Sequence, residues 1–159
     1  MKLRDIIRAP KSGIHTGAWK AGKIPRSEYP LSRARDRDYK YGPAYDWRIV
    51  KFTALGLDCR VLILLRERRE IYYARLGVVE HNDTKIICSY EFHGAEPGWH
   101  CHAKCGPLST IQAGLNRQDS ARFPDGRRFH RDKVFGVTKA TALRRAIDFY
   151  RIEEPGTLV

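Results

Sequence analysis

The sequence contains no apolar run close to the twenty or so residues that a helix needs to cross a bilayer. Its longest apolar run, Val61–Leu65, has the length of a buried strand. The first residues, Met1–Arg8, lack the apolar centre and small-residue cleavage site of a secretory signal. We therefore expect a cytoplasmic protein without a membrane partner.

Several common catalytic and binding motifs are also missing. The glycine patterns Gly-x-Gly-x-x-Gly and Gly-x-x-x-x-Gly-Lys-Ser/Thr do not occur, which argues against the nucleotide-binding folds that use them. The serine-hydrolase pattern Gly-x-Ser-x-Gly does not occur either. The chain has four cysteines, but Cys101 and Cys105 have no downstream histidine pair, so zinc-finger spacing is not met. We expect free thiols, because nothing indicates secretion.

Positive charge is abundant and unevenly distributed. The net charge is +12, with eleven bases against four acids in residues 1–45 and ten against four in residues 112–152. Residues 46–111 are nearly balanced. Such a field attracts polyanions, so the first functional prediction is binding of nucleic acid or another phosphate-rich partner. The predicted contacts are Arg33, Arg35, Arg37, Arg122, Arg127, Arg128 and Arg131. The same charge could serve solubility alone, or an adaptor that contacts an acidic protein.

The sequence predicts an α+β fold. Residues 1–45 are rich in proline and glycine and have no apolar period, which indicates a basic, loop-rich N-terminal arm. Residues 46–159 should form a single domain around an antiparallel meander of four to five strands, joined by short turns. The strands are expected at Asp46–Ala54, Cys59–Glu67, Ile71–Glu80, Lys85–His93 and, as a fifth, Trp99–Cys105. Thr138 should cap a helix over about Lys139–Ile152 that packs on one face of the sheet.

The run from Glu91 to Cys105 holds three of the six histidines and two of the four cysteines. Side chains alternate between faces along a strand, so a hairpin here places the apolar residues and the thiols of Cys88, Cys101 and Cys105 inside. The opposite, polar face should point outward, and it collects four residues: Glu91, His93, His100 and His102. Along the strand, His100 and His102 should lie roughly 6.5–7 Å apart.

Three interpretations of this polar face stay open. The histidines could make ordinary surface hydrogen bonds. They could instead transfer protons on an anionic substrate, as in a small nuclease-like hydrolase, with Glu91, His93, His100 and His102 as the catalytic group and Lys104 or an arginine steadying negative charge. Lastly, the three histidines and Glu91 could bind a metal ion. The sequence alone assigns no metal ligand and no cofactor, with zinc as the candidate ion. If Cys101–Cys105 were a loop, a zinc site formed by both cysteines and histidines would be possible.

Overall fold

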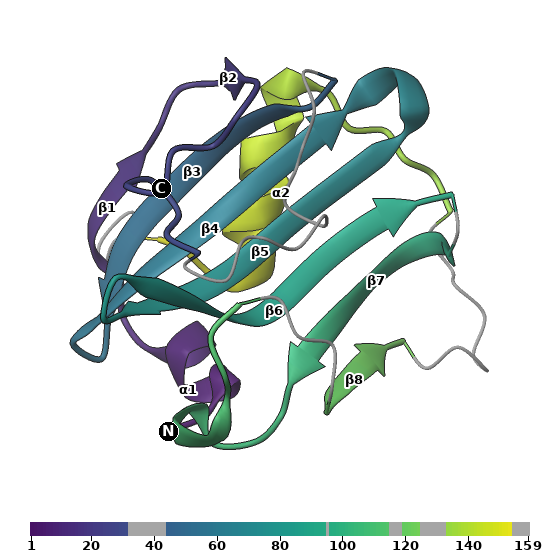
Figure 1. Cartoon of the computed structure of the whole chain (residues 1–159). Coiled ribbons are helices and arrows are strands. Elements are labelled where there is room, and N and C mark those ends of the chain that lie inside the picture. The colour runs from purple at the N-terminus through teal and green to yellow at the C-terminus, as the bar shows by residue number, and fades with distance from the viewer. Residues whose placement is uncertain (32–43, 95, 115–118, 125–132, 154–159) are drawn as a thin grey trace.

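The computed structural model describes residues 1–31, 44–94, 96–114, 119–124 and 133–153 of the chain (Figure 1). These ranges contain two α-helices, eight strands and two short 3-10 helices at Glu67–Arg69 and Leu108–Thr110. In chain order the helices and strands are α1 (Leu3–Arg8), β1 (Ser12–Thr16), β2 (Lys20–Ala21), β3 (Asp46–Ala54), β4 (Leu57–Arg66), β5 (Ile71–Glu80), β6 (Asp83–His93), β7 (Glu96–Lys104), β8 (Ser120–Phe123) and α2 (Lys139–Tyr150).

The eight strands form one antiparallel sheet in the order β1-β3-β4-β5-β6-β7-β8, with β2 also paired to β3. The turns at Leu55-Gly56 and His81-Asn82 have positive φ at both residues, as two-residue hairpins between twisted strands require. The predicted antiparallel meander is confirmed in its central strands. The sheet is larger than the four to five strands expected, because β1, β2 and β8 extend it.

The structure does not support the predicted N-terminal arm. Residues 3–21 form α1, β1 and β2, and the two strands pair with β3. Lys11, just after α1, is almost fully buried. Its Nζ donates to the carbonyls of Ile6, Ile7 and Ala9 at 2.8, 2.8 and 2.6 Å. The ammonium group therefore satisfies the carbonyls at the end of a helix too short to be stable alone.

Both faces of the central strands are covered. The larger core packs against α1 and α2. Helix α2 lies behind β3, β4 and β5 in Figure 1. On the opposite face, Tyr29 and Leu31 pack against Trp47, Leu62 and other apolar residues of the sheet. The run Val61–Leu65 is fully buried because its side chains enter both cores in turn.

The C-terminal helix α2 confirms the prediction. Thr138 and Thr141 form a capping box at its start, and Arg151, with φ of 53°, ends it. The hydroxyl of Tyr150 donates to the carbonyl of Ala74 at 2.6 Å, which fixes the helix on the sheet. Burial and nearby thiol groups raise the pKa of this phenol, so it remains a donor.

Candidate functional site

The β6–β7 hairpin brings the predicted histidines and Glu91 together. In its register Glu91 lies opposite His100, and Ser89 lies opposite His102. The pairing shifts between Glu91 and His93, where the ribbon has an irregularity. All four predicted side chains therefore meet on one face, as the two-residue period of a strand requires.

Three imidazoles converge on a single carboxylate oxygen. The Nε2 atoms of His93, His100 and His102 lie 3.1, 3.4 and 3.7 Å from Oε2 of Glu91. The rings of His93 and His100 are 5.1 Å apart between centroids, and those of His100 and His102 are 5.3 Å apart. An ionised carboxylate only accepts hydrogen bonds, so His93 donates to Glu91 from Nε2.

The side chains of this cluster are more buried than those on the solvent-exposed face of an ordinary hairpin. The side chains of Glu91 and His100 are 1% and 0% exposed, and those of His93 and His102 are 12% and 14% exposed. The expectation that the polar face points outward is therefore wrong for Glu91 and His100. Their burial excludes the interpretation that these two residues are ordinary surface groups. Fully buried ionisable groups also need charged or hydrogen-bonding partners.

The backbone fixes the orientation of the His100 ring. Its Nδ1 lies 2.9 Å from the carbonyl of Gly98, so Nδ1 carries a proton and donates it. Gly98 has φ of 94°, a conformation that favours glycine and that sets the direction of this carbonyl. The Nε2 atom is left facing Glu91, where it holds either a proton or a metal ion. A backbone partner on the far nitrogen is the usual support of a histidine ligand.

The electrostatics of the cluster keep Glu91 ionised and favour positive charge beside it. Burial acts to raise the pKa of the Glu91 carboxyl, but hydrogen bonds from His100 and His93 and the charge of Arg75 hold it well below its usual range. Burial acts to lower the pKa of His100, but bonding to Glu91 and to the Gly98 carbonyl raises it. Glu91 thus stays negative inside the protein and draws positive charge towards Nε2 of His100.

Three of the four residues have ligand atoms close enough for one metal ion. Those of Glu91, His100 and His102 all lie within 4.8 Å of one another. With zinc–ligand bonds of 2.0–2.1 Å, the edge of a coordination tetrahedron is about 3.4 Å. The distance from Oε2 of Glu91 to Nε2 of His100, 3.4 Å, equals that edge, and the distance to Nε2 of His102, 3.7 Å, is slightly longer. His93 contacts Glu91 but stands outside this three-residue set.

Sequence reasoning missed two neighbours of the cluster on β5. Tyr73 lies opposite Glu91 in the sheet, and its ring stacks on His93 at 5.8 Å. Arg75 is 4% exposed, with its guanidinium 4.8 Å from the Tyr73 ring centroid. Both could have been found by extending the predicted alternation to the strand next to β6.

The other predicted site residues have different outcomes. Arg122 lies on β8 opposite His102, and its guanidinium donates to the carbonyl of Pro124 at 2.9 Å. It therefore belongs beside the histidines. The remaining predicted arginines lie outside the described residues: Arg33, Arg35, Arg37, Arg127, Arg128 and Arg131.

The four cysteines are free. Cys88 and Cys101 pack with the larger core on the other face of the sheet. The prediction that Cys105 is a core residue is wrong, because β7 ends at Lys104 and the Cys105 side chain is exposed. The sulfur atoms therefore do not join the histidines in a mixed zinc site.

Comparison of the chain with protein-family models, curated proteins and solved structures gives no match. Within the described ranges, neither α-helix has the length and apolar character needed to span a membrane.

Proposed function

We propose that the protein binds one transition-metal ion through Glu91, His100 and His102, and that zinc is the leading candidate. The observation that supports this most directly is the convergence of the two Nε2 atoms on Oε2 of Glu91, at 3.4 and 3.7 Å. Two imidazoles and a carboxylate suit zinc and the neighbouring divalent metals, whereas calcium and magnesium prefer oxygen ligands.

The proposed chemistry is hydrolysis by a metal-activated water. A set of three protein ligands leaves one tetrahedral position for water, as in catalytic zinc sites, whereas structural sites supply four. A metal ion held by these residues would lower the pKa of a bound water and so supply a nucleophile near neutral pH. His93 lies beside Glu91 and is partly exposed, which suits a group that accepts a proton from the water. In this proposal His93 is the general base.

Metal titration of the purified protein tests the binding step. Apo protein, prepared with a chelator, should take up one equivalent of Zn²⁺ in calorimetry and one Co²⁺ with visible absorption bands. His102→Ala should weaken zinc binding by more than about 100-fold, because even the loss of a supporting residue costs 10–100-fold. His15→Ala and His81→Ala are matched controls, since both side chains are exposed outside the cluster.

The result that would refute the metal site is equal zinc affinity in the wild type and in His102→Ala, with both folded by circular dichroism. Turnover is tested separately with bis(4-nitrophenyl) phosphate. His93→Gln should keep its zinc and lose most hydrolysis. A zinc-loaded wild type that does not hydrolyse the ester faster than free zinc would reject phosphodiester hydrolysis and leave a metal-binding protein.

Binding of nucleic acid through the basic segments remains a prediction from charge. Arg122 is the one predicted contact within the described ranges, and its position beside His102 suits a phosphate held near the metal.

A further inference from the structure

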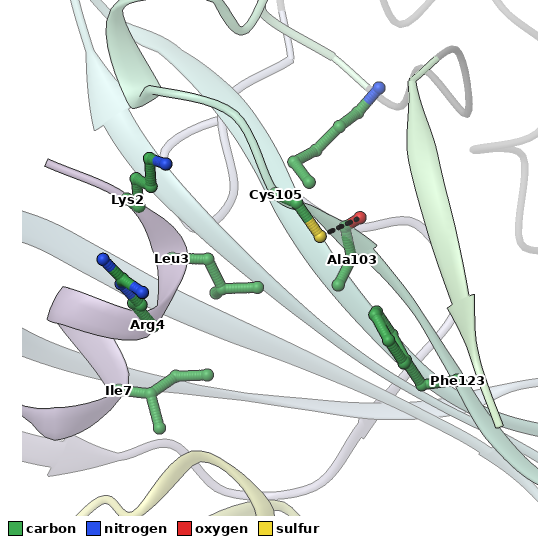
Figure 2. Close-up of a pocket in the computed structure, with 8 residues that line it drawn as sticks. Lys2, Leu3, Arg4, Ile7, Ala103, Cys105 and Phe123 are labelled. Atoms are coloured by element: carbon green, nitrogen blue, oxygen red, sulfur yellow. Dashed lines mark hydrogen bonds between the residues drawn. The ribbon is translucent and has the colours of Figure 1, made fainter.

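A second candidate site lies on the opposite face of β7. A groove of about 290 Å³ separates α1 from the β7–β8 edge of the sheet (Figure 2). Figure 2 shows Leu3 and Ile7 extending from α1 towards Ala103, Cys105 and Phe123. Ala103 alternates along β7 with His102, so this groove is separate from the metal site.

The walls of the groove are apolar and one of them is uncovered. Phe123 is 50% exposed, although large apolar side chains elsewhere in the described chain are mostly buried. It stands at the end of β8, a four-residue strand at the edge of the sheet. Leu3 and Ala103 form the floor and are nearly buried. An exposed aromatic beside an apolar floor indicates surface that a ligand can cover.

The rim of the groove is positive. The exposed side chains of Lys2 and Arg4 lie along it, and no carboxylate lines the groove among the residues that the structure describes. Lys104 also lines the groove, but it is nearly buried and the charge of Asp119 acts on it. Asp5 lies nearby and pairs with Arg4 at 3.9 Å, but both side chains are exposed and the pair is weak. The groove thus combines an apolar interior with cations at its mouth.

We infer that this groove binds a free medium-chain fatty acid. The chain lies against Leu3, Ile7 and Phe123, and the carboxylate lies at Lys2 and Arg4. At about 30 Å³ for each atom-sized unit, 290 Å³ holds an unbranched chain of about ten carbons. The inference is independent of the metal site and of the proposed hydrolysis.

Cys105 provides the assay because its exposed thiol lines the groove. Decanoate, used below the concentration at which it forms micelles, should slow alkylation of Cys105 by iodoacetamide about tenfold. Cys105→Ser identifies the fast-reacting thiol, since the other three cysteines are buried or half-buried. From hexanoate upward, each added methylene should tighten binding up to about fourfold and then level off near ten carbons.

Charge reversal tests the role of the rim. Lys2→Glu/Arg4→Glu should weaken decanoate binding at least tenfold, while the control Lys23→Glu/Arg26→Glu, which reverses exposed charges elsewhere, should not change it. Phe123→Ser should weaken binding about fivefold. Circular dichroism and the melting temperature establish that each variant is folded.

Three outcomes would overturn the inference. Decyltrimethylammonium could protect Cys105 as well as decanoate does, which would remove the role of the cations. Protection could be independent of chain length, which would remove the role of the apolar floor. Sedimentation could show a dimer in which Cys105 is shielded without any amphiphile, which would assign the groove to a second copy of the chain.

Discussion

The two faces of the β6–β7 hairpin differ in chemistry although both contain fully buried side chains. On the α2 face, Trp99 packs against the rings of Tyr72, Tyr90 and Phe92 at 5.0–5.3 Å between centroids. On the other face, three histidines lie within 3.7 Å of one carboxylate oxygen of Glu91. Aromatic packing stabilises the fold, and this is sufficient to explain the residues on the first face. Buried ionisable groups stabilise a fold poorly, so the second face indicates function.

The largest effect should come from damaging the aromatic face. Trp99→Ala removes the indole that contacts three rings and donates to the carbonyl of Val134 at 2.9 Å. We expect a loss of about 3–5 kcal/mol in the free energy of unfolding, measured with urea. Phe123→Ala, at a half-exposed ring, is the control and should cost less than 1 kcal/mol. Similar losses in the two variants would mean that this face does not carry the stability.

The next effect separates the polar face from the aromatic one. Zinc at 100 times its dissociation constant should raise the unfolding free energy by about 2.7 kcal/mol, through binding to the folded state. His102→Leu should abolish this gain while its metal-free stability stays close to that of the wild type. Thermal unfolding with and without zinc measures both quantities. A large loss of stability in metal-free His102→Leu would make the polar face structural.

A buried charge with a structural role provides the third test. Lys11 donates to three carbonyls, and Lys11→Met leaves them without that donor. We expect a loss of about 2 kcal/mol in the free energy of unfolding, with zinc affinity unchanged. Urea unfolding and calorimetry measure the two. If zinc affinity falls with stability, the metal site depends on the packing around α1, and the contrast between the faces weakens.

The smallest effect concerns an ion pair at the solvent. Glu28 and Lys51 lie 3.1 Å apart with each side chain about one-third exposed, and the hydrogen bond from Lys51 lowers the pKa of Glu28. Because the pKa of Glu28 is lowered in the folded state, the ion pair stabilises the protein at pH values above the unfolded-state pKa of about 4.3. This stabilisation is lost as the pH falls. Because solvent screens the pair, Glu28→Gln should cost at most about 0.5 kcal/mol at pH 7 and nothing at pH 3. A larger loss at pH 3 would reverse the assigned sign.

Local patterns predicted the centre of the fold and the members of the site. The alternation of Cys88, Tyr90 and Phe92 with Ser89 and Glu91 located the second half of β6 and its two faces. The same pattern predicts Ile86 on the side of Cys88, which is wrong: Ile86 packs in the smaller core, because the pairing of β5 with β6 shifts at this point. The same rule placed Glu91, His93, His100 and His102 together, since pairing neighbouring strands needs only a short turn.

The remaining features depend on contacts between distant segments. The strands β1, β2 and β8 have two to five residues, too few to show a period, and β1 pairs with a strand thirty residues later. Lys11 is a residue type that is seldom buried, so no pattern predicts its position under α1. The burial of His100 depends on tertiary packing, which a strand pattern does not contain. Cys105 is exposed because β7 ends one residue earlier than expected.

The pairing of Glu91 with His100 has a consequence for how the chain can change. Glu91 lies on β6, whereas His100 and His102 lie on β7, so this set of three residues comes together only in one alignment of the two strands. Loss or gain of a single residue between Gly94 and Gly98 would rotate the histidines into the aromatic layer and bring Trp99 and Cys101 to the ionic side. The pairing of Glu91 with His100 therefore depends on the length of this connection.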